Sequence, residues 1–181
     1  MKDAVKLFGI LFFGLLTAVI IYPFLHESGH LIAAVLLGAE VLEFNLFPLP
    51  NILCNMANMG IVEKIIIGLN GLFLPIFFSA VMLKMFGNSF WNRYISFVLN
   101  GISLLASIIS AIAVIFFYLG NPVENEDVTQ ILYMSPNSGT IILILTIFST
   151  IYLIIKIALD KPIQRCLAYF GLINKRKSGT A

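Results

Sequence analysis

Two histidines four positions apart are the residues of this chain best suited to chemistry. They lie in His26-Glu27-Ser28-Gly29-His30 and are the only histidines among 181 residues. On a helix this spacing places both imidazoles on one side, where each can give a nitrogen to the same zinc ion. Glu27 then lies beside the metal and can accept a proton from a water molecule that zinc has made acidic. The pattern predicts metal-assisted hydrolysis of an amide bond, with His26 and His30 as ligands and Glu27 as the catalytic base.

The elements that must position these residues are apolar helices. The chain is 60% hydrophobic and 11% charged, and its mean hydropathy of +1.00 excludes an ordinary soluble domain. A helix that spans a membrane needs about 20 mainly apolar residues. Four stretches approach or exceed that length, at about 7–25, 65–83, 94–120 and 139–159. We therefore expect a single all-α integral-membrane domain over residues 1–181, with about four transmembrane helices.

Basic residues are divided unequally between the two ends of these helices. Of the eleven Lys and Arg residues, only Lys64 falls on the face that carries the connections after the first and third spans. That face instead carries most of the acidic residues: Glu40, Glu43, Glu63, Glu124, Glu126 and Asp127. The positive-inside rule then predicts a multi-pass protein of the cell membrane with both termini cytoplasmic. The basic tail, residues 160–181, should either lie along the inner headgroup surface or remain solvated.

The connection between the first two spans differs in composition from the helices. Residues 41–46 are Val-Leu-Glu-Phe-Asn-Leu, and Pro48 and Pro50 follow. This composition predicts one or two short strands with turns. The sequence contains no Gly-rich phosphate loop and no nucleic-acid-binding motif, so we expect no nucleic-acid partner. Cys54 and Cys166 fall on opposite faces of the predicted topology and imply no disulfide framework.

The stretch from Pro23 to Val41 resembles the site-2 protease family of intramembrane zinc metalloproteases. Members carry His-Glu-x-x-His in an apolar helix, often as His-Glu-x-Gly-His followed by small residues, as in the stretch from His26 to Ala34 here. The resemblance implies one zinc ion per chain. It also implies a β-hairpin after the His-Glu-x-x-His helix, where an extended substrate could add as a strand. Glu43 and Phe44 are candidate substrate-binding residues on this basis.

A second, looser likeness to the family lies in Gly68-Leu69-Asn70-Gly71, which resembles a glycine-bearing segment of a following helix. It makes Asn70 a further candidate for binding substrate. The alternative is that Asn70 and its glycines pack helices together, as such residues commonly do in membranes.

The third zinc ligand in the family is an aspartate, commonly within Leu-Asp-Gly, and this chain has no such sequence. Its stretch from Asn121 to Leu132 partly resembles an Asn-Pro-containing stretch of the family and offers Asp127 at the start of an expected helix. The predicted topology places Asp127 on the same side as the two histidines, nearer the outer face, whereas better-known members have their zinc nearer the cytosol. We predict Asp127 as the third ligand. The remaining alternatives are Glu124, Glu126, Glu40 and Glu43.

The function expected from these features is zinc-dependent endopeptidase activity within the membrane. The substrate would be a membrane-associated or exported peptide or a transmembrane helix. Two alternatives remain: a non-catalytic relative that binds metal and serves as a binding subunit, and a metal or ion transporter that uses intramembrane His, Glu and Asp. The sequence leaves the substrate's identity and a homo-oligomeric state open.

Overall fold

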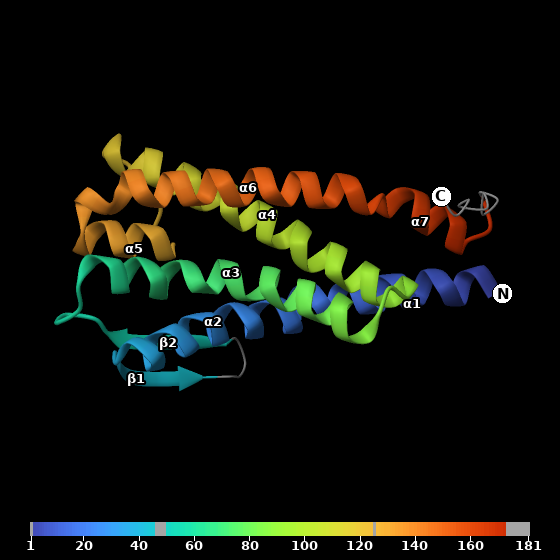
Figure 1. The fold of residues 1–181 in the computed structure, drawn as a ribbon, viewed down its shortest axis with the longest axis horizontal. Coiled ribbons are helices and arrows are strands. Elements are labelled where there is room, and N and C mark those ends of the chain that lie inside the picture. Colours follow the sequence, from blue (N-terminus) through green and yellow to red (C-terminus); the bar gives the residue numbers. More distant parts are fainter. Residues whose placement is uncertain (1, 46–49, 125, 173–181) are drawn as a thin grey trace.

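A computed structural model describes residues 2–45, 50–124 and 126–172 of the chain. Four helical stretches in these ranges are long and apolar enough to cross a membrane: Asp3–Leu37, Ile61–Phe86, Phe90–Tyr118 and Pro136–Tyr169. They run along the length of an elongated bundle, with a small two-stranded sheet on one side (Figure 1). The predicted class, an all-α fold of four spanning helices with a hairpin, is confirmed.

The first stretch is longer than the predicted span 7–25. It comprises α1 (Lys2–Leu16), a π-helical turn η1 (Thr17–Ile21) and α2 (Tyr22–Leu37). Thr17 is fully buried in the π turn, and its hydroxyl donates to the Phe13 carbonyl at 2.7 Å. Single π turns within α-helices are frequent at functional sites. The helix ends at Gly38, whose φ of 80° suits a residue without a Cβ. Both histidines therefore lie in the second half of one continuous helical stretch.

The expected hairpin follows α2. Strand β1 (Glu40–Asn45) pairs antiparallel with β2 (Asn51–Asn55), with Glu40 opposite Asn55 and an irregularity near Val41. Val41 and Cys54 pack against the buried Ala33, Ala34 and Ile67, so the hairpin is held against α2 and α3. Residues 46–49 of this connection lie outside the described residues.

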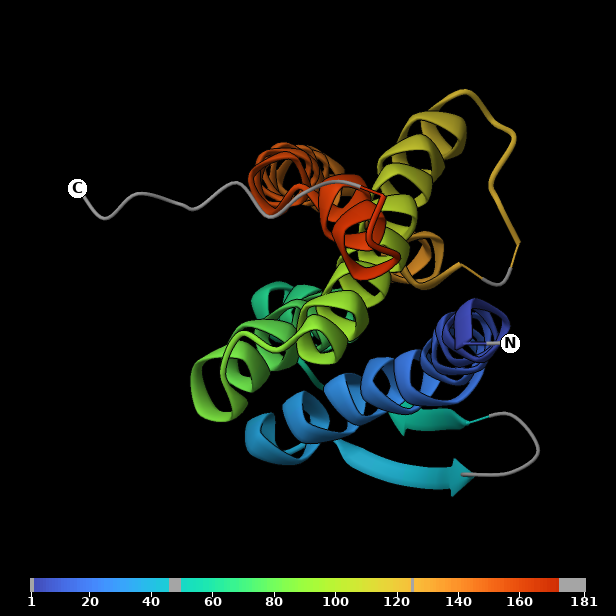
Figure 2. The same cartoon turned by 90° about the vertical axis from the view of Figure 1, so that its right-hand side faces the viewer.

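The described residues after the hairpin form five helices and one 3-10 turn. They are α3 (Ile61–Phe86), α4 (Phe90–Tyr118), α5 (Asp127–Met134), a 3-10 turn η2 (Pro136–Ser138), α6 (Gly139–Asp160) and α7 (Pro162–Tyr169). The end-on view shows α4 between α3 and α6 (Figure 2), and α4 contacts both. The start of α1 and helix α7 lie at one end of the bundle, and α5 lies near the other end (Figure 1). Residues 173–181 of the predicted tail lie outside the described residues.

A buried polar cluster joins α3, α4 and α6. The hydroxyls of Ser79 and Ser96 are 2.7 Å apart, and Asn100 Nδ2 donates to Ser79 at 3.0 Å. Lys156 Nζ donates to Asn100 Oδ1 and to Ser79 Oγ, each at 3.3 Å. Hydrogen bonds between helices in a membrane contribute on average about 0.6 kcal/mol each, and they also fix helix register. This cluster therefore aligns the three helices toward the end that carries the termini.

Candidate metal centre

Three side chains from α2 and α5 converge on one point. His26 Nε2 lies 3.0 Å from Asp127 Oδ2, His30 Nε2 lies 3.3 Å from the same oxygen, and the two Nε2 atoms are 3.2 Å apart. Tetrahedral zinc with bonds of about 2.0–2.1 Å places its ligand atoms about 3.3 Å from each other. Within the described residues these three form the group that could hold a metal ion. Their spacing fits one zinc ion, and within the described residues no fourth His, Cys, Asp or Glu belongs to the group.

The orientation of the His30 ring is fixed by a hydrogen bond through the nitrogen that does not face the other two candidate ligands. Its ring is 6% exposed, and its Nδ1 lies 2.7 Å from the backbone carbonyl oxygen of Ile67 on α3. A carbonyl only accepts hydrogen bonds, so Nδ1 carries the proton and donates it. The other ring nitrogen, Nε2, faces His26 and Asp127 and is the atom through which His30 could bind a metal ion. A backbone acceptor behind a ligating histidine is the usual arrangement in metal sites.

Glycines let α3 approach the two imidazoles. A Cβ at Gly71 would lie 2.7 Å from His30 Cε1 and 2.9 Å from His26 Cε1, closer than packed carbon atoms allow. A Cβ at Gly29 would lie 3.0 Å from Gly71 Cα, so the two backbones are in direct contact. Asn70 Nδ2 donates to the Gly29 carbonyl at 2.6 Å and ties the helices at this crossing. The metal centre therefore depends on a tight α2–α3 crossing as well as on its ligands.

Asp127 is held in place by the way α5 begins and packs. Glu126 caps the helix: one carboxylate oxygen accepts from the Thr129 N–H at 3.0 Å, and the other accepts from the Ser110 hydroxyl of α4 at 2.7 Å. The apolar face of α5 is buried against α3 and α4, through Val128, Ile131 and Leu132. This docking brings Asp127, which lies 101 positions from His26 in the sequence, against that histidine.

The two carboxyl groups at the start of α5 have opposite pKa shifts. Burial raises the pKa of Asp127, but hydrogen bonds and electrostatic attraction from His26 and His30 outweigh burial and hold that pKa below its ordinary value. Burial also raises the pKa of Glu126, and the hydrogen bonds from Ser110 and Thr129 offset this only in part. Asp127 is therefore the more readily ionised of the two carboxyl groups, and the Glu126 carboxyl group joins the start of α5 to α4.

A cavity of about 300 Å³ opens beside the three ligands. Glu27, His30 and Asp127 line it, together with Gly68 and Gln130 from α3 and α5. Residues 51–54 of β2 form the opposite wall. This volume is at the lower end of the usual range for ligand sites. Glu27 thus lines a space next to the candidate ligand atoms.

The structure brings together four of the predicted site residues, His26, Glu27, His30 and Asp127. The other predicted residues lie elsewhere. Asn70 contacts the α2 backbone, Glu43 accepts from Asn45 on β1, and neither they nor Phe44 lines the cavity. Their contact with substrate stays a prediction.

Among the alternative ligands, Glu40 accepts from Asn55 within the hairpin and Glu126 caps α5, so both have other partners. Sequence reasoning missed the roles of Gly71, Glu126 and the Ile67 carbonyl. The pair Gly68 and Gly71 was a signal for close helix packing, but nothing in the sequence aligned it with the imidazoles.

No protein-family model, curated protein or solved structure matches this chain. The fold and the site together define a helical protein with four potential membrane spans and a candidate His-His-Asp metal centre.

Proposed function

We propose that this protein is a zinc-dependent endopeptidase embedded in a membrane and related to the site-2 proteases. The observation that carries the proposal is the convergence of three ligand atoms, 3.0–3.3 Å apart, next to a cavity that Glu27 also lines. The resemblance of residues 23–41 to that family supports the same activity. A carboxylate next to the metal but outside its ligand set is what peptide hydrolysis requires and what metal storage does not.

Each residue has a distinct role in this reaction. His26, His30 and Asp127 would hold the metal, and zinc when bound supplies Lewis acidity that lowers the pKa of a water molecule to about 7. Glu27 accepts a proton from the attacking water while the oxygen of that water adds to the substrate carbonyl carbon. Glu27 then delivers that proton to the amide nitrogen as the C–N bond breaks.

The cavity wall formed by β2 suits an extended peptide. One edge of β2 pairs with β1, while residues 51–54 of the same strand line the cavity. A substrate segment that has unwound into an extended conformation could bind along this wall with its carbonyl groups directed at the ligands. A helical substrate would have to unfold locally first, because its own hydrogen bonds cover the backbone groups.

The orientation of the protein follows from charge. Lys84, Arg93, Lys161 and Arg165 lie at or just beyond helix ends on the side of the bundle that carries the chain termini. By the positive-inside rule that end is cytoplasmic, and the metal centre lies toward the outer face of the cell membrane.

The test compares membrane proteomes of cells that produce the wild type, Glu27→Gln or the matched control Glu63→Gln. Glu63 is an acidic residue in the first turn of α3 and does not line the cavity. We expect a membrane or exported protein to accumulate uncut only with Glu27→Gln, while zinc content stays at the wild-type level in all three. Stoichiometric zinc with no difference in cleavage would indicate a non-catalytic metal-binding protein or a transporter. Wild-type protein without zinc would refute the metal centre.

A further inference from the structure

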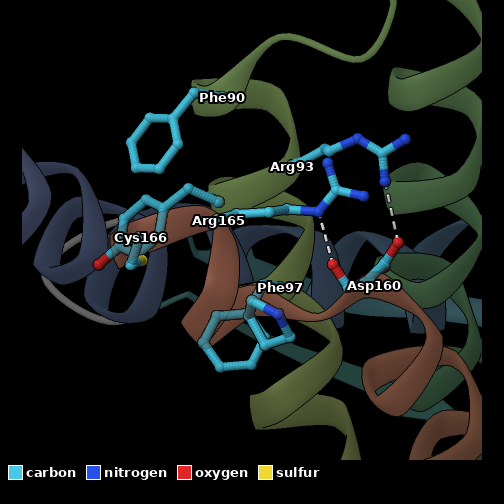
Figure 3. A pocket seen from close by; sticks show the side chains of 8 residues that line it. Phe90, Arg93, Phe97, Asp160, Arg165 and Cys166 are labelled. Atoms are coloured by element: carbon cyan, nitrogen blue, oxygen red, sulfur yellow. Dashed lines mark hydrogen bonds and ion pairs between the residues drawn. The ribbon is translucent and has the colours of Figure 1, made fainter. Parts of the chain in front are cut away.

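A second polar cleft lies at the end of the bundle that carries the termini, away from the metal centre. It lies between the first turn of α4 and helix α7, and its volume is about 430 Å³. Its lining residues are Asn88, Phe90, Arg93, Arg165, Ala168 and Tyr169. Figure 3 shows a neighbouring pocket that shares Phe90, Arg93 and Arg165 with this cleft, and in it Arg93 and Arg165 approach Asp160 from two different helices. The volume falls within the range of small-ligand sites.

The cleft has an excess of positive charge and of hydrogen-bond donors. Arg93 donates to the Asp160 carboxylate at 3.1 Å, whereas Arg165 donates through Nε to the Asp160 backbone carbonyl (Figure 3). Arg93 is thus the one of the two arginines that forms an ion pair with the Asp160 carboxylate. Each guanidinium has five N–H donors, and Arg93 Nε is buried without a partner among the described residues. Two forked donors with free N–H groups match the oxygens of a phosphate.

The first turn of α4 adds to the positive electrostatic potential of the cleft. The helix begins at Phe90, and both Phe90 and Asn88 line the cleft. The unpaired N–H groups of a helix N-terminus carry partial positive charge and favour anions. The cleft therefore combines two arginines with the positive end of a helix, and Asp160 lines the neighbouring pocket that shares both arginines with it.

The surroundings favour a lipid over a soluble anion. The rings of Phe90 and Tyr169 stack with centroids 3.9 Å apart and form an apolar wall. Met85 and Phe86, each 69% exposed, end α3 at the same side of the bundle. Helix α7 forms the last part of the apolar stretch Pro136–Tyr169, begins after the break at Lys161, and exposes Ile163, as helices that lie in the headgroup region do. A phosphate bound here would have apolar surface beside it for acyl chains.

We propose that this cleft binds the phosphate group of an anionic phospholipid, with Arg93 and Arg165 as its main donors. Basic pockets between helices on the cytoplasmic side of a membrane protein bind such headgroups by the same physics. The lipid would bridge α4 and α7 and hold α7 against the bundle. The proposal does not depend on the metal centre or on peptidase activity.

The test measures lipid binding to the full-length protein, purified in detergent, by native mass spectrometry. Phosphatidylglycerol, which has a net negative charge, is the probe, and phosphatidylcholine, which is zwitterionic with no net charge, is the comparison. We expect phosphatidylglycerol to bind the wild type at least about tenfold more tightly than phosphatidylcholine, and Arg165→Gln to lose about tenfold or more of that affinity. Arg165→Lys keeps the charge without the fork and should be intermediate. Lys84→Gln removes a positive charge from the same end, outside the cleft, and should stay within about twofold of wild type.

Three results would overturn the proposal. The first is equal affinity of the wild type for the two lipids. The second is equal loss in Arg165→Gln and Lys84→Gln, which would reduce the effect to general surface charge. The third is displacement of phosphatidylglycerol by equimolar inorganic phosphate or glycerol 3-phosphate, which would identify a soluble phosphate as the ligand. Size-exclusion chromatography and the melting temperature serve as folding controls, and both should match the wild type in every variant.

Discussion

Replacing Gly71 by alanine should weaken zinc binding although none of the three ligand residues is mutated. The added Cβ would lie 2.7 Å from His30 Cε1 and 2.9 Å from His26 Cε1. Carbon atoms pack at about 3.5–4.0 Å, so the imidazoles must retreat by about 0.6–1.3 Å. Metal–ligand distances tolerate deviations of only about 0.2 Å. Both histidines cannot then remain at bonding distance from the same ion.

The expected loss is about 10–100-fold in zinc affinity, the range typical when the support of a ligand is disturbed. That corresponds to about 1.4–2.7 kcal/mol of binding free energy. Competition with a chelator of known affinity, on protein purified in detergent, measures it directly. Gly101→Ala is the matched control, because a Cβ at Gly101 in α4 meets no atom within 4 Å.

Gly101→Ala should bind zinc as tightly as the wild type, and as a helix-interior Gly→Ala change it should not destabilise the fold. Wild-type affinity in Gly71→Ala would show that α3 does not lie against the imidazoles. Equal loss in both variants would show that any added methyl group in a helix disturbs the bundle. Either result would refute the close contact between Gly71 and the two imidazoles on which the expected loss of zinc affinity depends.

Three further predictions concern the supports of the site. Glu126→Ala should lower zinc affinity about tenfold, because α5 loses both its N-terminal cap and its hydrogen bond to Ser110. Glu126→Gln should lower that affinity less. Unchanged affinity of Glu126→Ala in the chelator assay would contradict this prediction. In metal-free protein, the lowered pKa of Asp127 gives stability that is complete above pH about 4 and is lost as pH falls from there toward the lowered value. Thermal unfolding from pH 6 to 3 should therefore show an acid-side loss that Asp127→Asn lacks, and identical profiles would refute the assignment. Lys156→Met removes a donor from Asn100 and should destabilise the fold by about 1–2 kcal/mol with zinc content unchanged; an unchanged melting temperature would contradict that role.

The local part of the metal site could be predicted from the sequence because it depends on helix geometry alone. Residues four apart share a face of any helix, so His26 and His30 needed no tertiary information. Glu27 followed from its position beside the first ligand. The four spans and the hairpin were predictable for the same reason, since length, hydropathy and turn residues are local properties.

The tertiary part depended on packing that no local pattern specifies. Asp127 was selected by family resemblance and by sidedness, but its contact with His26 requires α5 to be docked by Val128 and its neighbours. The role of Gly71 depends on the register of α3 against α2, and a shift of one residue would turn it away from the imidazoles. The cleft beside Arg165 required α7 to contact α4, whereas the sequence predicted only that a basic tail lies along the inner headgroup surface or stays solvated.

The most direct test of the central claim is the X-ray absorption spectrum at the zinc edge of the purified wild-type protein. The account predicts one zinc ion per chain whose ligands are nitrogen and oxygen at about 2.0–2.1 Å, with the multiple-scattering signature of two imidazoles. Asp127→Asn should lose most of this signal. Sulfur at about 2.3 Å would place the metal on Cys54 or Cys166 instead, and that spectrum, or a wild-type protein without zinc, would contradict the account.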